Sequence, residues 1–254
     1  LYGVNTNHFF LLNHGAGSFY SGAVDCDNPP ANVFCFARGG EKIQDALGLD
    51  MDNDGDLDLA AIHINNAHTL YFNDNNASLP RDTGLEISAV NGLPRSLALG
   101  DLNDDGRLDA VAGNQASAGV LLNQGNGSFA LAQGLAASQD YRDLNLADLD
   151  GDNDLDILAS LNPGKLVIFF NDSGTFFSGA LDCGDSNITC LGDASDSNIH
   201  AAIGDVDGDD DLDILANRAS GTRTLYLNDG SGGFGISRTF GYPAAAEGDL
   251  ALAD

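Results

Sequence analysis

Short apolar runs alternate with polar turns along the whole chain. On either side of one acidic stretch, for example, Ser96–Gly100 and Leu108–Ala112 alternate apolar residues with small or polar ones. Runs of this kind, bounded by Gly, Asn and Asp, predict strands joined by hairpins. No segment keeps a helical period with caps for more than about ten residues, a typical minimum for a globular helix. The pattern therefore predicts an all-β fold.

Two phrases repeat along these runs. The first is an acidic phrase of nine residues with copies at Asp50–Asp58, Asp101–Asp109, Asp148–Asp156 and Asp205–Asp213, and its first residue recurs at Asp254. The spacings between successive copies are 51, 47, 57 and 49 residues. The second phrase ends in asparagine and occurs at Phe10–Asn13, Leu70–Asn73, Val120–Asn123, Ile168–Asn171 and Leu225–Asn228.

A repeat of about 50 residues has room for four short strands and matches one blade of a β-propeller. A solenoid of nonapeptide repeats would place the acidic phrases far more densely. We therefore predict a single repeat domain over residues 1–254, a β-propeller of about five four-stranded blades that form either a complete ring or part of a larger one. The approximate units are 1–45, 46–96, 97–143, 144–200 and 201–254, and the first and last are incomplete.

The acidic phrases have the donor pattern of a calcium loop. Alternating positions 1, 3 and 5 offer side-chain oxygens, position 7 a backbone carbonyl, and position 9 a closing carboxylate, as in the first part of an EF-hand loop. Position 6, which must turn sharply, is always Gly, Asn or Asp. The candidate ligands are Asp50, Asp52, Asp54, Asp56 and Asp58; Asp101, Asn103, Asp105, Arg107 (by its carbonyl) and Asp109; Asp148, Asp150, Asp152, Asp154 and Asp156; and Asp205, Asp207, Asp209, Asp211 and Asp213.

An all-oxygen donor set with flexible geometry favours Ca²⁺ over Mg²⁺, which prefers a tight octahedron and keeps its waters. Zinc is disfavoured because no Cys/His cluster has ligand spacing. We expect about four calcium ions per chain, one for each complete phrase. The alternative is that the phrases are solvated Asp/Gly turns, since both residues are common in turns.

The charge of the chain narrows the choice of partners. There are 38 acidic and 10 basic residues, a formal net charge of −28, and only three of the acids are glutamate. Such a protein is repelled by the phosphates of nucleic acids, so we expect no nucleic-acid partner. The hydrophobic fraction of 43% is enough for a core, and no apolar run approaches the length of a membrane span.

The phrase at Gly100–Asp109 and Gly204–Asp213 resembles the FG-GAP/VCBS repeat, which occurs in integrin α-subunit propellers and in many secreted or surface bacterial proteins. The resemblance covers nearly the whole chain. It implies a β-propeller with calcium in a hairpin of each blade and a role in adhesion, carbohydrate binding or scaffolding outside the cell. No Gly-Ala-Pro follows the loops, and Asn153 and Asp210 replace the usual Gly. The match is therefore nearer the VCBS branch, and integrin-like ligand binding does not transfer.

The cysteines indicate a compartment, and the sequons offer candidate glycan sites. Local pairing is the economical connectivity and gives disulfides Cys26–Cys35 and Cys183–Cys190, which imply an oxidising environment; four free thiols are the alternative. Asn-x-Ser/Thr sequons occur at Asn76, Asn126, Asn171 and Asn187. Asn187 is the best glycan candidate, because Asn171 occupies the repeated hairpin position and is better explained by turn geometry.

The sequence contains none of the nucleophile, zinc-protease or phosphate-loop motifs of common enzymes, and its five histidines are scattered. We therefore expect an extracellular or cell-surface, calcium-stabilised, non-enzymatic protein that acts in adhesion or as a surface scaffold. One alternative is a structural subunit of an extracellular filament or surface layer, and another is a lectin-like carbohydrate-binding propeller. Partners would then be protein or glycan ligands at the cell surface.

The two ends of the sequence complement each other. It begins at Leu1, past the acidic phrase of its first unit, and stops at Asp254, the first residue of a further phrase. We expect either a mature or partial segment of a longer repeat chain or two ends that share one blade. Sharing between neighbouring molecules would be head-to-tail self-association, an open-ended contact that propagates a filament.

Overall fold

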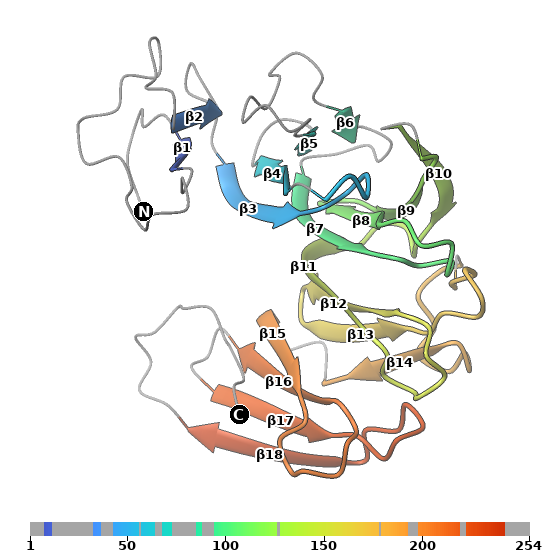
Figure 1. Ribbon diagram of the computed structural model, residues 1–254. Helices are drawn as coiled ribbons and strands as arrows, with labels where there is room; N and C mark the ends of the chain where they lie inside the picture. The colour runs from blue at the N-terminus through green and yellow to red at the C-terminus, as the bar shows by residue number, and fades with distance from the viewer. Residues whose placement is uncertain are drawn as a thin grey trace. The chain divides into compact units, whose positions relative to one another are not determined.

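The computed structural model describes residues 8–11, 33–36, 43–55, 57–63, 68–72, 85–87, 94–125, 128–177, 179–192, 198–218 and 222–241 (Figure 1). The chain forms two compact units, Leu1–Ser88 and Ala89–Asp254, and each is described by itself. The described part of the chain contains strands and turns and no helix, so none of its segments is a helix that could cross a bilayer.

The first unit contains a hairpin and a four-stranded sheet. Antiparallel strands β1 (His8–Leu11) and β2 (Val33–Phe36) form the hairpin. The sheet has the order β3-β4-β5-β6, which is also the order of its strands along the chain. Its strands are β3 (Ile43–Leu49), β4 (Asp58–His63), β5 (His68–Tyr71) and β6 (Leu85–Ile87).

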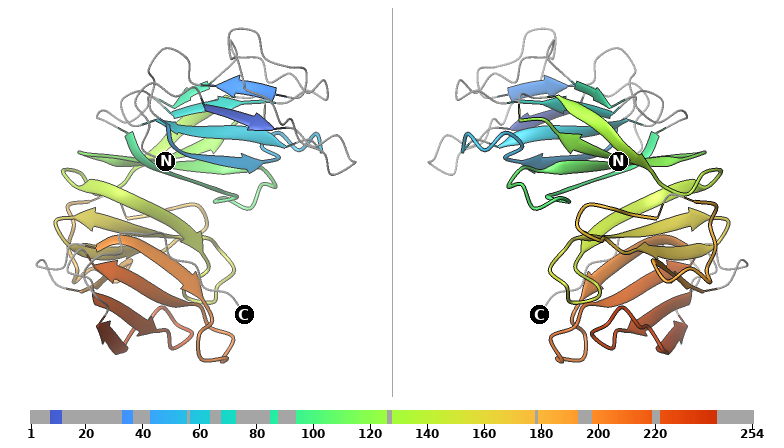
Figure 2. Two further views of the ribbon diagram at one scale, coloured as in Figure 1. Left: turned by 90° about the vertical axis from the view of Figure 1, so that its left-hand side faces the viewer. Right: turned by 90° about the vertical axis from the view of Figure 1, so that its right-hand side faces the viewer.

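The second unit contains three further four-stranded sheets, which Figure 2 shows one after the other from β7 to β18. Each is an antiparallel meander in which neighbours in sequence are neighbours in the sheet. The strands are β7 (Pro94–Gly100), β8 (Asp109–Asn114), β9 (Ala118–Asn123) and β10 (Phe129–Gly134); β11 (Asp140–Ala147), β12 (Asp156–Asn162), β13 (Lys165–Phe169) and β14 (Ile188–Leu191); and β15 (Asn198–Gly204), β16 (Asp213–Arg218), β17 (Thr222–Leu227) and β18 (Ile236–Gly241).

A register shift recurs in the first hairpin of every four-stranded sheet. It lies near the start of the first strand, between Ile43 and Asp45 in β3 and between Pro94 and Ser96 in β7. The same irregularity falls between Tyr141 and Asp143 in β11 and between Asn198 and His200 in β15. Bulges increase the local twist of a strand and are retained as structural features. The four sheets are therefore copies of one structural unit at the level of register as well as sequence.

Two hydrophobic clusters lie between consecutive sheets of the second unit. The first joins the sheet of β7–β10 to that of β11–β14, with Val111 and Val120 on one side and Ile157, Val167 and Phe169 on the other. The second joins the sheet of β11–β14 to that of β15–β18, through residues that include Leu158, Leu166, Ile168, Ile214 and Tyr226. The central strands are buried on both faces, as the burial of every residue of β8 illustrates.

Four-stranded antiparallel meanders packed face to face are the blades of a β-propeller. The prediction of an all-β, propeller-type fold is confirmed, while the number of blades stays a prediction. The sheets begin at Ile43, Pro94, Asp140 and Asn198, slightly before the units expected from the repeat spacing.

Candidate metal centres

Each acidic phrase forms the loop between the first and second strands of a four-stranded sheet. The loops follow β3, β7, β11 and β15, and the aspartate at position 9 is the first residue of the next strand in all four. Because the meander order is the same in every sheet, the four loops have equivalent places in their blades. Candidate ligand Asp56 lies outside the described residues.

The aspartate at position 9 is buried in every loop. Asp109, Asp156 and Asp213 have 0% exposure and Asp58 has 2%. One carboxylate oxygen accepts the backbone N–H of position 2, at 2.7 Å from Met51, 3.1 Å from Leu102, 2.8 Å from Leu149 and 2.9 Å from Val206. Since a carboxylate oxygen has two lone pairs, the same oxygen can accept this N–H and bind a cation.

The aspartate at position 1 organises the loop around its carboxylate. In all four loops its Oδ2 accepts the N–H of position 6, at 3.0 Å in the Asp50 loop, 2.7 Å in the Asp101 loop, 2.9 Å in the Asp148 loop and 3.1 Å in the Asp205 loop. Its Oδ1 accepts a second N–H, from position 4 or 5. The backbone thus wraps around a carboxylate before any cation is considered.

Three of the loops bring carboxylates from positions 1, 3 and 9 together. Ligand oxygens of each trio lie within 4.8 Å of one another, and the trios are Asp50, Asp52 and Asp58; Asp148, Asp150 and Asp156; and Asp205, Asp207 and Asp213. In the third loop Asp150 Oδ1 is also buried and has no hydrogen-bond partner. A buried, unpartnered carboxylate oxygen beside two other carboxylates is costly unless a cation neutralises it. The residues therefore fit an oxygen-bound divalent ion, which would supply electrostatic cross-linking of the loop.

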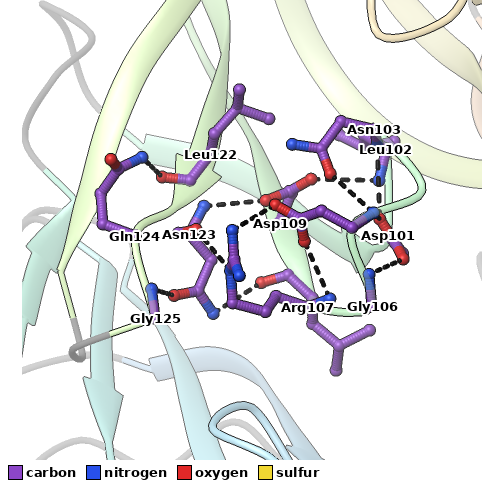
Figure 3. Close-up of polar contacts among 12 residues, drawn as sticks. Asp101, Leu102, Asn103, Gly106, Arg107, Asp109, Leu122, Asn123, Gln124 and Gly125 are labelled. Carbon is purple, nitrogen blue, oxygen red and sulfur yellow. Dashed lines mark hydrogen bonds and ion pairs between the residues drawn. The ribbon is translucent and has the colours of Figure 1, made fainter.

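The second loop differs in composition and in contacts (Figure 3). Position 3 is Asn103, whose side-chain oxygen accepts the N–H of Asp105 at 3.1 Å. The Arg107 guanidinium forms an ion pair with Asp105, and its Nε donates to the carbonyl oxygen of Asn123 at 3.0 Å. Two carboxylates and one amide oxygen remain at positions 1, 3 and 9. This loop consequently carries less negative charge than the other three.

Positions 5 and 7 are not part of the carboxylate trios. In the three loops of the second unit, a position 5 side-chain oxygen accepts the backbone N–H of position 7, at 3.0 Å in Asp105, 2.9 Å in Asp152 and 3.1 Å in Asp209. The Asp154 side chain at position 7 instead accepts the N–H of Ser173 at 3.1 Å. The proposed use of the position 7 carbonyl stays a prediction.

Burial and mutual repulsion shift the pKa values of the candidate ligands. Burial raises the pKa of Asp156 to about 7. Burial is also the largest cause of the raised pKa of Asp109 and of Asp150, and for Asp150 the neighbouring Asp152 raises it further. The pKa of Asp205 is lowered instead, chiefly because its carboxylate accepts the backbone N–H of Gly208. Closely spaced carboxylates that resist ionisation are sites where a cation restores the charged form.

Sequence reasoning missed the full role of the asparagine phrase. The backbone N–H groups of Asn123, Asn171 and Asn228 donate to the remaining oxygen of the position 9 aspartate at 2.8, 2.9 and 2.9 Å. The side-chain Nδ2 groups donate to the carbonyl oxygen of position 8 in the same loop, each at 3.1 Å. The sequence did contain a signal for this role: the number of residues between the position 9 aspartate and the asparagine of the second phrase is nearly constant.

The same contacts rule out one sequon. Asn171 is 3% exposed, and its Nδ2, the atom that a glycan would occupy, donates two hydrogen bonds. A glycan there is incompatible with the folded structure. Asn187 is exposed and remains a candidate, whereas Asn76 and Asn126 lie outside the described residues.

One of the two expected disulfides is present. Cys183 and Cys190 are bonded, with their Cα atoms 5.5 Å apart, and Cys190 belongs to β14. The Cys26–Cys35 pairing lies outside the described residues, because Cys26 is not among them and nothing is described of the Cys35 side chain.

The fold and the loops define a β-propeller protein with acidic hairpin loops. Residues 50–112, 101–159 and 148–216 each match the FG-GAP-like repeat, and the chain belongs to this family. Comparison with curated protein sequences finds no significant match.

Solved structures resemble the chain at low sequence identity. A chain of an active polycomb repressive complex 2 in the basal state has 11% identity and a TM-score of 0.50, over 89% of this chain and 40% of that one. A chain in the crystal structure of BBS1N in complex with ARL6DN has 11% identity and a TM-score of 0.46, over 73% of this chain and 50% of that one. An Agrocybe aegerita lectin specific for non-reducing terminal N-acetylglucosamine has 17% identity and a TM-score of 0.39, over 91% and 73%. The chain thus spans about half or less of the first two, and these likenesses concern the fold alone.

Proposed function

We propose that this chain is an extracellular, calcium-stabilised repeat protein that acts in adhesion or as a surface scaffold and has no enzymatic activity. The observation that carries the proposal is the recurrence of one oxygen-lined loop at the same place in four consecutive sheets, three times with carboxylates within 4.8 Å of one another. A repeated cation site of this kind stabilises an architecture without requiring a single reactive centre.

Calcium is the ion that suits these donors best. The described ligand atoms at positions 1, 3 and 9 are carboxylate or amide oxygens, which hard divalent cations prefer. Each nine-residue phrase also offers backbone carbonyl oxygens, and a set of many oxygen donors with flexible geometry suits the larger coordination sphere of Ca²⁺. About four ions per chain would reduce the formal net charge of −28 and its self-repulsion.

The Cys183–Cys190 bond supports an extracellular location. Disulfides form and persist in oxidising compartments and are rare in the cytosol. Membership of the FG-GAP-like repeat family agrees with this location. We assign the dense aspartate clusters to metal binding and not to acid–base catalysis. We therefore propose adhesion or scaffolding as the role, and not an enzymatic activity.

Calcium binding is tested by isothermal titration of metal-free protein with CaCl₂. The thermal unfolding of the protein is measured separately in calcium and in EDTA. We expect about four ions per chain and a higher Tm in calcium than in EDTA, because a ligand that binds only the folded state stabilises it. Asp150→Asn should remove one ion and part of the rise in Tm. The matched control is Asp172→Asn, at an exposed aspartate in the turn after β13. Binding of magnesium as tight as that of calcium, or no binding at all, would overturn the calcium assignment.

The role itself is tested with beads that carry the purified protein. Clustering of coated beads in 2 mM calcium, reversed by EDTA, is the expected result for a self-associating scaffold or filament subunit. Retention on a glycan array without bead clustering would instead favour the lectin-like alternative. If the beads do not cluster in calcium and the protein is not retained on the glycan array, the proposed role in adhesion or scaffolding is contradicted.

A further inference from the structure

In the second unit, Asn171 and Asn228 each connect their own sheet to the acidic loop of the sheet before it. Asn171, which follows β13, donates its Nδ2 to the carbonyl oxygen of Leu102 at 3.0 Å. Asn228, which follows β17, donates its Nδ2 to the carbonyl oxygen of Leu149 at 2.9 Å. Leu102 and Leu149 both occupy position 2 of an acidic loop, so the two contacts are equivalent.

These contacts form part of a continuous series of hydrogen bonds between loops. Leu149 accepts from Asn228 through its carbonyl and donates its N–H to Asp156, at 2.8 Å. Asn228 in turn donates its own N–H to Asp213, at 2.9 Å. The position 9 carboxylates of the third and fourth loops are therefore joined through only two intervening residues. The second and third loops are joined in the same way through Leu102 and Asn171.

The side chains at position 2 strengthen the connection. Leu102 is 2% exposed and packs in the cluster that contains Val167 and Phe169 of the following sheet. Leu149 is 0% exposed and packs with Ile214 and Tyr226 of the sheet after its own. The second and third loops are thus each fixed to the following sheet by a hydrogen bond and by a buried apolar side chain. Val206, the equivalent residue of the fourth loop, is 44% exposed.

We propose that Asn171 and Asn228 are positioning residues that couple metal binding in neighbouring loops, so that an ion in one loop favours binding in the loop before it. This inference rests on the proposed calcium binding. An ion that holds Asp213 fixes the backbone of Asn228, and the Asn228 amide then holds Leu149 in the position that directs its N–H to Asp156. The conformational entropy that is lost when the first ion orders these residues is not lost again when the second ion binds. Hydrogen bonds in series also polarise one another.

The first test uses hydrogen exchange and mass spectrometry of the full chain in saturating calcium, with and without Asp207→Ala. Asp207 is an exposed member of the fourth trio, and its loss should weaken that site and accelerate exchange in residues 205–213. Coupling predicts that residues 148–156 also exchange about fivefold faster, the lower end of typical allosteric couplings. Strand β10 serves as the internal control and should not change.

The outcomes separate the inference from the function on which it rests. Faster exchange in both loops supports coupling. Faster exchange in the fourth loop alone overturns coupling and leaves calcium binding intact. No change in either loop contradicts metal binding by the fourth loop itself.

The second test asks whether the asparagine transmits the effect. In an Asn228→Ala background, Asp207→Ala should still accelerate exchange in the fourth loop but no longer in the third. Asn187→Ala is the matched control, because it makes the same chemical change at an exposed asparagine of the neighbouring sheet, and it should preserve the coupling. Persistence of the coupling in Asn228→Ala would overturn the role of this residue. If Asn228→Ala does not fold, the first test still decides whether the loops are coupled.

Discussion

Gly208 and Asp210, two residues apart in the fourth loop, both have left-handed backbone conformations, with φ angles of 81° and 72°. The same pair of positions is left-handed in every loop, with one glycine and one Asn or Asp in each: Asn53 and Gly55, Asp104 and Gly106, and Gly151 and Asn153. The loops therefore require two left-handed residues, and glycine occupies either of them. This explains why Asn153 and Asp210 replace glycine at position 6 without loss of the turn.

The first prediction concerns Gly208, where an added Cβ would meet no atom within 4 Å, so only the backbone conformation opposes substitution. Gly208→Ala should lower the free energy of unfolding in calcium by about 1–2 kcal/mol, the cost of a left-handed L-residue. Gly208→Asn should lose clearly less, because Asn tolerates this conformation, as Asn53 illustrates. Urea denaturation measures both. The control Gly134→Ala lies at an open position of β10 without positive φ and should be neutral; equal losses for Ala and Asn would contradict the argument.

The second prediction separates structural from metal-binding carboxylates. Asp156→Ala should destabilise the protein even in EDTA, by about 2–4 kcal/mol, because the buried N–H groups of Leu149 and Asn171 both lose their acceptor. Asp150→Asn should not lower stability in EDTA, because it removes a charge that is unpaired without a cation, and it should reduce the increment that calcium adds. Paired urea curves in calcium and in EDTA measure the difference. A similar loss for both variants in EDTA would show that position 9 has no special structural role.

The third prediction concerns the pH dependence of metal-free protein. The pKa of Asp156 is raised from 3.8 to about 7 in the folded state, so the folded state holds a proton that the unfolded state releases at lower pH. The resulting stabilisation is complete below about pH 3.8 and is lost as the pH rises through about 7. The raised pKa values of Asp109 and Asp150 act in the same direction, whereas the lowered pKa of Asp205 opposes them.

Metal-free protein should accordingly unfold at a higher temperature at pH 5 than at pH 8. In saturating calcium the trend should reverse, because protons compete with the ion for the same carboxylates. Thermal unfolding at both pH values, with EDTA or calcium, checks the sign. Asp156→Asn, which cannot titrate at this position, should flatten the slope in EDTA, and an unchanged slope would assign the effect to other groups.

The fourth prediction concerns the Cys183–Cys190 bond. A loop of this size contributes about 2.5 kcal/mol in the chain-entropy model. The double variant Cys183→Ser/Cys190→Ser should therefore lower the free energy of unfolding by about that amount without changing calcium stoichiometry, since neither cysteine belongs to an acidic loop. Urea denaturation and calorimetry measure the two quantities. A loss of bound calcium would indicate that the bond also supports a loop.

The sequence by itself determined the class of fold, the repeat and the loops. Alternation of apolar and polar residues has the period of a strand, and the acidic phrase carries its donors at alternate positions, so both signals are local. The recurrence of the phrase at intervals of about 50 residues indicates the blade. Pairing of Cys183 with Cys190 was equally local. In each case the residues that interact lie close together in the chain.

Only the tertiary structure decided which carboxylates are buried, which meet, and what the asparagines do. Asp156 and Asp152 are the same residue type in the same acidic phrase, but only the structure shows that Asp156 is buried and accepts two backbone N–H groups. Asn171 reads as a turn residue or sequon, whereas its contact with Leu102 spans 69 residues of sequence. Such a contact depends on two sheets packing face to face, and no local pattern encodes the distance between atoms that only the packed core brings together.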